Sequence, residues 1–424
     1  MRLFSRSLLT AWLIVFTLSP EISAAQAIQT SRPEVVGMSS ERLQRLQSAF
    51  EGYVASGDLP GGVIQVTKNG RTVYLQAFGF RDLESQVAMT RNTLFRIASQ
   101  TKAVVSVGAM ILQEEGVLLL TDPVSDYLPE FASTTVAEPL EGGGYTVVPA
   151  TRPITIRDLL THTAGVGYGG GVAADEWREA GITGWYLADR SEPVRETVRR
   201  MASLPFEAQP GERWVYGYST DILGAVLEAA SGMPLDEFLE DRIFRPLDMR
   251  DTHFFLPESK ADRLATVYSL GEDGLTRAPD PGKGVGQGHY VEGPRTNFSG
   301  GAGLVSTAKD YTRFLQMLLN GGSLYATQLL SRKSVELMTV NQVGDLYGGE
   351  EQSFGLGFRI REKLDNNTLP GSPGMYGWGG AYHSVYWLDP QENMVVTYFT
   401  QVIPASGLDD HAKLLTLLYQ AIVD

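Results

Sequence analysis

The residues best suited to chemistry in this chain are a serine and a lysine three positions apart, Ser99 and Lys102, at the start of an apolar, helix-like run. Side chains at this spacing lie on one face of a helix, within reach of each other. A serine hydroxyl is a weak nucleophile until a base takes its proton, and a lysine with a lowered pKa can be that base. The pair predicts an acyl-transfer site, and a plain helix cap is the alternative interpretation of Ser99.

The same spacing recurs at Ser306 and Lys309, so the pattern alone is weakly specific. The run after Ser99 is apolar almost all round, which predicts a central, buried helix. A buried helix start leaves backbone N–H groups free to stabilise an oxyanion, and its positive dipole end disfavours a charged lysine. The Ser306 copy is better interpreted as a helix N-cap with a solvated lysine, so we expect the chemistry at Ser99.

Two further segments add aromatic groups. Tyr216 and Tyr218 stand just before a second apolar, helix-like run, and residues 377–381 (Gly-Trp-Gly-Gly-Ala) precede a strand-like run near the C-terminus. Together with Ser99 and Lys102, they resemble in chain order the three motifs of the serine β-lactamase and penicillin-binding-protein superfamily, Ser-x-x-Lys, Tyr-x-Asn and Lys-Thr-Gly. The resemblance implies the β-lactamase/transpeptidase-like fold and a serine hydrolase.

Three other stretches extend the resemblance over nearly the whole chain. Residues 159–165 resemble the family's Leu-Leu-x-His-x-x-Gly segment, and residues 245–252 resemble its Pro-Leu-Gly-Met-x-x-Thr segment, with Asp248 in place of the usual glycine. Residues 301–308 also match, which implies a structural role for the segment that contains Ser306.

The departures from the motifs are informative. The third motif is Trp378-Gly379-Gly380 instead of Lys-Thr-Gly, and Tyr218 occupies the position of the asparagine. Both changes resemble family VIII carboxylesterases, the class C β-lactamase-like branch of the superfamily. β-Lactams and peptidoglycan stems carry a carboxylate that a lysine at the third motif helps to bind. Tryptophan cannot bind it in that way, whereas neutral esters lose less from the change.

The resemblance implies a role for each polar residue. Ser99 would attack the ester carbonyl and form an acyl-enzyme, while Lys102 and Tyr216 would share the proton transfers. Tyrosine could act as the base only with a lysine nearby to stabilise its phenolate, so the general base stays open between the two. Tyr218 as the catalytic tyrosine, with Tyr216 as packing, is the alternative assignment.

By the same resemblance, the oxyanion would lie between the backbone N–H groups of Ser99 and Ala381. Gly379 and Gly380 would leave the strand edge bare for substrate, and Trp378 would form a wall of the acyl or alcohol pocket, with a core aromatic as its alternative interpretation. The residues expected to contact substrate are Trp378, Gly379, Gly380, Ala381 and Tyr218.

The chain must supply a scaffold for these residues. Residues 63–68 and 71–78 read as strands around Asn69-Gly70, a strong hairpin signal, and residues 384–388 and 394–401 read as a second pair. Antiparallel strands near both ends predict one sheet that both ends of the chain build. The middle shows mostly helical spacing, so we expect the α+β class: an antiparallel sheet flanked by helices, with an inserted, mostly helical region.

We expect a single catalytic domain over residues 28–424. Its α/β part would cover about 28–95 and 300–424, and its mostly helical part about 96–299. The long Gly- and Pro-rich segments 132–153 and 280–303 are expected to shape the mouth of the substrate pocket.

The N-terminus has the pattern of a secretory signal. Arg2 and Arg6 precede an apolar run over residues 8–18, and small residues follow up to Ala27. The run is short for a membrane-spanning helix. We therefore expect residues 1–25 to be removed on export to the periplasm or the medium, and an uncleaved anchor is the alternative.

Charge and composition exclude several classes of partner, metal site and cofactor. A net charge of −14 with scattered acidic residues argues against nucleic acid or an anionic membrane as partner. The absence of cysteine excludes disulfides, thiolate metal sites and a cysteine nucleophile. The five histidines show no metal spacing, so no metal or cofactor is expected. His162 is expected to be structural, and His383, just after the third motif, could line the site.

Three functions follow from this pattern. The first is a secreted carboxylesterase that cleaves small acyl esters through a Ser99 acyl-enzyme. The second is a β-lactamase or D,D-peptidase, or a penicillin-binding protein with weak β-lactam turnover. The third is an inactive binding protein on the same fold, and the intact Ser99, Lys102 and Tyr216 argue against it. In either enzymatic case, the expected partner is a small ester or a β-lactam-like molecule.

Overall fold

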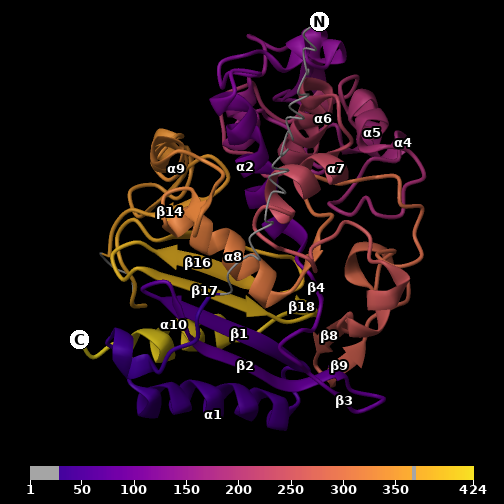
Figure 1. Cartoon of the computed structure of the whole chain (residues 1–424). Coiled ribbons are helices and arrows are strands. Elements are labelled where there is room, and N and C mark those ends of the chain that lie inside the picture. The colour runs from indigo at the N-terminus through magenta and orange to yellow at the C-terminus, as the bar shows by residue number, and fades with distance from the viewer. Residues whose placement is uncertain (1–27, 365–368) are drawn as a thin grey trace, which may run out of the picture.

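The computed structural model describes residues 28–364 and 369–424 (Figure 1). The expected signal segment, residues 1–25, lies outside the described residues. Within them, no helix combines the length and the apolar character that crossing a membrane requires.

One antiparallel sheet of eight strands organises the molecule, in the order β13-β14-β15-β16-β17-β1-β2-β3. Its strands come from both ends of the chain, and the central pair joins β1 to β17 with Val63 opposite Phe399. The predicted sheet is therefore confirmed. The strands are β1 (Gly61–Lys68), β2 (Arg71–Asp82), β3 (Val87–Ala88), β13 (Gln352–Phe354), β14 (Arg359–Arg361), β15 (Tyr376–Gly379), β16 (Val385–Asp389) and β17 (Met394–Phe399).

Helices cover both faces of this sheet, so β1 is buried along its whole length. Successive side chains of a strand point to opposite faces, and accordingly Val63 belongs to the core shared with the helical region, while Ile64 belongs to the core under the terminal helices. Figure 1 shows α1 and α10 on one face and α8 on the other. These helices are α1 (Ser40–Ser56), α8 (Ala308–Leu319) and α10 (Asp410–Tyr419).

The helical region is built around α2 (Thr101–Glu114), whose residues from Thr101 to Leu112 are all buried. This burial confirms the central position predicted from its apolar sequence. Helix α6 packs directly against it (Figure 1). The other α-helices of the described residues are α3 (Ile156–Leu160), α4 (Ala174–Glu179), α5 (Val194–Met201), α6 (Ser219–Ser231), α7 (Leu235–Leu239) and α9 (Arg332–Met338).

Short strands tie the connecting segments to this frame. Residues 132–153, one of the two long segments expected to shape the pocket mouth, contain the hairpin β5-β6, in which Val136 pairs with Val148. Alternation of β-branched residues around a glycine-rich turn explains the hairpin. The short strands are β4 (Phe95–Arg96), β5 (Thr135–Pro139), β6 (Tyr145–Pro149), β7 (Pro205–Phe206), β8 (Tyr268–Gly271), β9 (Gly274–Arg277), β10 (Val305–Ser306), β11 (Ser323–Leu324), β12 (Thr327–Gln328) and β18 (Val402–Ala405).

The second Ser-x-x-Lys copy lies at the start of α8, with one correction to the prediction. The N-cap is Thr307, whose hydroxyl accepts the N–H of Asp310, and not Ser306. Ser306 belongs to β10, is fully buried and contacts the hydroxyl of Thr252 at 2.8 Å. Lys309 is exposed, as expected for a solvated side chain.

A buried carboxylate stabilises α3, which leads into the segment with His162. Asp158 and Thr155 form a capping box, and Arg152 donates to both oxygens of Asp158 at 2.6 and 2.9 Å. Burial alone would raise the pKa of Asp158, but the bonds from Arg152 and Thr155 hold it below its usual value. A lowered pKa means that this carboxylate contributes stability above pH 4, where it is also ionised in the unfolded chain.

We predict that Asp158→Ala lowers the free energy of unfolding by about 2 kcal/mol at neutral pH, because it removes the cap and the buried acceptor. Urea unfolding followed by circular dichroism measures the change. The difference from wild type should shrink as the pH falls through the lowered pKa. Asp175→Ala is the control, because Asp175 pairs with Arg178 on the surface and should contribute under about 0.5 kcal/mol. Equal losses at both positions would contradict the prediction.

Candidate active site

Ser99 lies in the single 3-10 turn Ala98–Gln100 that leads into α2. Its side chain is half-buried, while its chain neighbours are buried. Ala98, directly before it, has a φ of 43°, a left-handed conformation that residues other than glycine rarely adopt. Bonds on both sides hold this turn: Ile97 N–H donates to Leu304 O, and Gln100 N–H donates to Ile97 O. Strain that the surroundings maintain is typical of functional sites.

Lys102 lies one helical turn later and points its amine toward Ser99. The side chain is buried, with 3% exposed. Its Nζ lies 3.5 Å from Ser99 Oγ, a long contact of the kind that tightens when substrate binds. The same Nζ donates to Gly301 O at 2.7 Å and to the hydroxyl of Tyr168 at 3.1 Å. The structure thus brings the two predicted residues together and directs the amine at three oxygen atoms.

Tyr216 brings the third predicted group to the amine from another segment of the chain. Its ring centre lies 4.7 Å from Lys102 Nζ, which stacks the ammonium against the aromatic face. The indole Nε1 of Trp378 donates to its hydroxyl at 3.1 Å. With a donor on its oxygen, the phenol keeps its own hydrogen available to another acceptor. Of the two candidate tyrosines, Tyr216 is therefore the one that contacts Lys102.

Tyr218 occupies a different environment from the one expected. Its side chain has no exposed surface, its hydroxyl donates to Gly184 O at 2.5 Å, and its ring stacks on Trp177. A side chain sealed in this way cannot contact substrate. We therefore correct the expected assignment of Tyr218 from substrate contact to packing behind Tyr168, whose ring meets it edge-on at 5.0 Å.

Tyr168 is a site residue that the sequence analysis missed. Its hydroxyl accepts a hydrogen bond from Lys102, and its ring lies edge-on to Tyr216 at 5.7 Å. Burial, followed by the neighbouring Tyr216, raises the pKa of Tyr168 well above its usual value, so it stays a neutral phenol. It lies in the glycine-rich segment 165–171, which has no helical or strand periodicity to mark it. The one clue in the sequence is that Tyr168 closely follows residues 159–165, which resemble a segment of the family.

A buried carboxylate positions the carbonyl group that binds Lys102. Asp221 Oδ1 accepts the hydroxyl of Ser299 at 2.6 Å and the N–H of Gly301 at 3.0 Å. Burial raises the pKa of Asp221, while the bond from Ser299 and the charge of Lys102 oppose that rise. A Cβ at position 301 would lie 2.3 Å from Asp221 Oδ2, so the close approach requires glycine there. Asp221 was also missed, because it stands inside an ordinary apolar helix.

His162 packs behind the site. Its ring lies 4.9 Å from that of Tyr216, and only 1% of the residue is exposed. Burial, and then the charge of Lys102, lower the pKa of His162 well below its usual value, so the imidazole is neutral. Its position agrees with the structural role expected from the sequence.

The third motif brings the end of strand β15 against the turn that carries Ser99. A Cβ at Gly380 would lie 2.5 Å from Ile97 O, so only glycine permits this approach. Trp378, Gly379, Gly380 and Ala381 are all half-buried. Within residues 28–364 and 369–424, neither Ser99 N–H nor Ala381 N–H donates to a protein acceptor. An oxyanion site requires two donors without a protein acceptor; here one belongs to Ser99 itself and the other to the turn that packs against the Ser99 turn.

Aromatic side chains surround Trp378. Its ring lies within 6.5 Å of the rings of Trp214, Tyr347 and Phe354, and 5.5 Å from that of Tyr216. Trp214 in turn stacks on Tyr216 with ring centres 5.6 Å apart. The side of the site at the third motif is therefore an aromatic wall.

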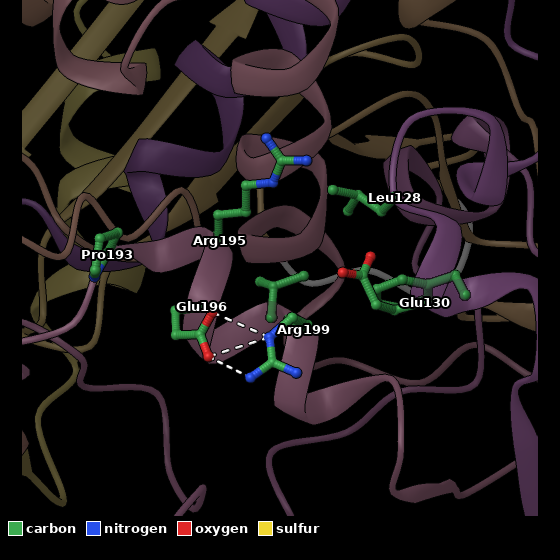
Figure 2. A pocket seen from close by; sticks show the side chains of 8 residues that line it. Leu128, Glu130, Pro193, Arg195, Glu196 and Arg199 are labelled. Atoms are coloured by element: carbon green, nitrogen blue, oxygen red, sulfur yellow. Dashed lines mark hydrogen bonds and ion pairs between the residues drawn. The ribbon is translucent and has the colours of Figure 1, made fainter.

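The helical half carries a separate hollow of about 220 Å³ (Figure 2). Arg199 donates through Nε to both oxygens of Glu196 at 3.1 and 3.0 Å. Glu196 and Arg199 at its rim are thus engaged with each other, and no serine, lysine or histidine lines it. It is therefore not a second acyl-transfer site. Its lining residues are Leu128, Glu130, Phe131, Pro193, Arg195, Glu196, Val198 and Arg199.

Comparison with known proteins agrees with this geometry. The family model described as Beta-lactamase matches residues 46–420. Esterase EstB of Burkholderia gladioli is 32% identical over 377 residues, which cover 84% of this chain and 89% of that protein. Lovastatin esterase of Penicillium rubens is 28% identical over 401 residues, which cover 85% and 94%. The solved structure of EstCE1, a hydrolase with promiscuous acyltransferase activity, superposes with a TM-score of 0.77 at 28% identity, covering 89% of this chain and 98% of that chain.

We predict that Lys102→Met slows covalent labelling of Ser99 by a fluorophosphonate probe about 10²- to 10⁴-fold, the usual contribution of a general base. Methionine keeps the volume of the side chain but removes the amine. Mass spectrometry of the labelled peptide measures the rate. Lys309→Met is the matched control in the second Ser-x-x-Lys copy and should change the rate less than twofold. A similar loss in both variants would show that the amine of Lys102 has no special role.

Proposed function

Because this chain belongs to the β-lactamase family and is a serine hydrolase, we propose that it is a carboxylesterase that cleaves small, uncharged acyl esters through a Ser99 acyl-enzyme. The observation that carries the proposal is the aromatic wall at the third motif. Trp378 supplies an indole that bonds to Tyr216, in the place where a lysine would bind a substrate carboxylate. An aromatic surface favours apolar acyl or alcohol groups, and it offers a carboxylate no charged partner.

The proposed reaction begins with attack of Ser99 Oγ on the ester carbonyl carbon. The Lys102–Tyr216 pair takes the hydroxyl proton as the C–O bond forms, and the backbone N–H groups of Ser99 and Ala381 bind the negative carbonyl oxygen. Collapse of the tetrahedral intermediate breaks the bond to the alcohol, which leaves with the proton from the same pair. Water then attacks the acyl-enzyme, gives up a proton to the pair, and releases the carboxylic acid as Ser99 regains its hydrogen.

The contacts of Lys102 define how this pair works. Gly301 O and the Tyr168 hydroxyl occupy two directions around Nζ, and Ser99 Oγ lies in a third. The ammonium next to the Tyr216 ring stabilises negative charge on that phenol when it forms. Lysine and tyrosine therefore act as one coupled unit, and a pH profile would report the pair and not either residue alone.

A matched pair of substrates tests the proposal. p-Nitrophenyl butyrate and mono-p-nitrophenyl succinate have acyl chains of the same length, but the succinate ends in a carboxylate. We predict that kcat/KM for butyrate exceeds that for succinate by at least about 100-fold, near the value of one buried charge-assisted interaction. Trp378→Lys should narrow this ratio at least tenfold, and Ser99→Ala should abolish both activities.

The β-lactamase and D,D-peptidase alternative is an outcome of the same experiment. Hydrolysis of nitrocefin with a higher kcat/KM than that of p-nitrophenyl butyrate would overturn the esterase proposal and favour that alternative. An inactive wild-type protein, with Ser99 unlabelled by the fluorophosphonate, would favour a binding protein on this fold.

We further propose that residues 1–25 direct export and are then removed. The basic start, the short apolar run and the small residues before position 28 support this proposal. The mass of the protein recovered from periplasm or medium tests it. A mass that includes residues 1–25, in protein recovered outside the cytoplasm, would count against cleavage.

A further inference from the structure

Three ionisable side chains form a compact cluster just beyond the third motif, and the reaction described above uses none of them. They are His383 in the turn after β15, and Asp410 and His411 at the start of α10. His383 Nε2 lies 2.8 Å from Asp410 Oδ1. The two imidazoles stack with ring centres 4.1 Å apart, and His411 Nε2 lies 3.0 Å from the backbone oxygen of His383. Asp410 and His411, both at the start of α10, thus contact the same turn residue, His383.

The central carboxylate is deeply buried. Asp410 has no exposed surface, and its Oδ1 contacts His383 Nε2 at 2.8 Å. Burial alone would raise the pKa of Asp410, but the bond from His383, the two nearby imidazoles and the buried hydroxyl of Tyr398 hold it below its usual value. A buried carboxylate, even when it is paired, often contributes less to stability than an apolar residue of the same size would. The cluster is thus a poor device for stability and needs another explanation.

The backbone of His383 indicates what the cluster holds. His383 has a φ of 67°, a left-handed conformation that costs a residue other than glycine about 1–2 kcal/mol. Its N–H donates to Gly380 O at 3.0 Å, and Gly380 N–H donates to Ser384 O at 2.8 Å. These bonds close a tight turn around Ala381, whose N–H is one of the two free donors at the site. The anchored ring of His383 therefore fixes the conformation that presents this N–H.

The ring geometry does not suit a metal ion. Two parallel imidazoles 4.1 Å apart direct their nitrogen lone pairs side by side instead of toward one point. The Nε2 atoms are also engaged already, with Asp410 and with the oxygen of His383. The contacts instead form a hydrogen-bonded clamp on the turn that contains His383.

We propose that His383 is a positioning residue for acyl transfer: its ring, anchored to Asp410 and stacked on His411, holds the turn that presents the Ala381 N–H to the oxyanion. This inference rests on the proposed Ser99 chemistry, but not on which ester is the substrate. An oxyanion donor acts mainly on the transition state, so its misplacement lowers kcat and leaves KM nearly unchanged. A purely structural role would lower stability without this selectivity.

Two substitutions of His383 distinguish the effect of its side-chain contacts from the effect of its backbone conformation. His383→Asn suits the left-handed conformation, since asparagine tolerates it well, but its shorter amide cannot reach Asp410. His383→Gln carries an amide nitrogen at nearly the reach of Nε2 and can still donate to Asp410. We predict that kcat for p-nitrophenyl butyrate falls about 10- to 100-fold in His383→Asn with KM within twofold, and that His383→Gln recovers most of the loss.

His253→Asn is the control. His253 is a half-buried histidine whose ring contacts Lys260 at 3.1 Å, and it takes no part in the third-motif turn. Its kcat and KM should stay within twofold of wild type. A thermal unfolding measurement on every variant checks that the variant is folded. Should His383→Asn not fold, Asp410→Asn takes its place, because it removes the charge but keeps the volume, and the same selective fall in kcat is expected.

Phosphonate labelling keeps this test separate from the esterase proposal. p-Nitrophenyl phosphonates form a tetrahedral adduct on the serine and need the oxyanion site whatever the natural substrate is, so the labelling rate of Ser99 should fall in His383→Asn in parallel with kcat. Unchanged labelling, a rise in KM with unchanged kcat, equal losses in His383→Gln and His383→Asn, or loss of activity in a chelator with recovery on adding zinc would each overturn the inference.

Discussion

The site depends on one buried amine and the groups that satisfy it. Lys102 Nζ lies within 3.5 Å of three oxygen atoms, those of Ser99, Tyr168 and Gly301, and it also faces the ring of Tyr216. An ammonium removed from water is expensive unless each of its hydrogens has an acceptor. The three oxygens and the Tyr216 ring come from four separate stretches of the chain, so the contacts that compensate for the burial of Lys102 also bring these groups together.

The scaffold keeps these stretches in register by close backbone approach. Gly380 lets the end of β15 meet the turn that carries Ser99, and Gly301 lets the segment before β10 meet the carboxylate of Asp221. Strand β15 belongs to the eight-stranded sheet, whereas Asp221 belongs to helix α6. The site is therefore formed where the sheet and the helical region meet, and each half supplies groups that the other half lacks.

Chemistry and selectivity come from different sides of this junction. In the proposed reaction, the helical side supplies Ser99 as the nucleophile and Lys102 and Tyr216 as the groups that take its proton. The sheet side supplies Trp378, which contacts Tyr216, and the Ala381 N–H; in the proposed reaction they face the uncharged part of the substrate and the oxyanion, respectively. A change at the third motif can thus alter the class of substrate while the nucleophile and its base stay the same, and the cluster of His383 and Asp410 lies on this second side.

The sequence by itself determined the pairing of Ser99 with Lys102, because helical spacing places residues three apart on one face whatever surrounds them. It also determined the antiparallel sheet, because two strand-like runs joined by a short turn pair with each other. Only the tertiary structure decided between Tyr216 and Tyr218, buried Tyr218 in the core, placed the cap of α8 at Thr307 and brought Tyr168 and Asp221 to the site. It also placed the ring of His383, expected from its position as a possible lining residue, against Asp410. The positions of those residues depend on contacts between segments far apart in the chain, and local spacing in the sequence does not predict such contacts.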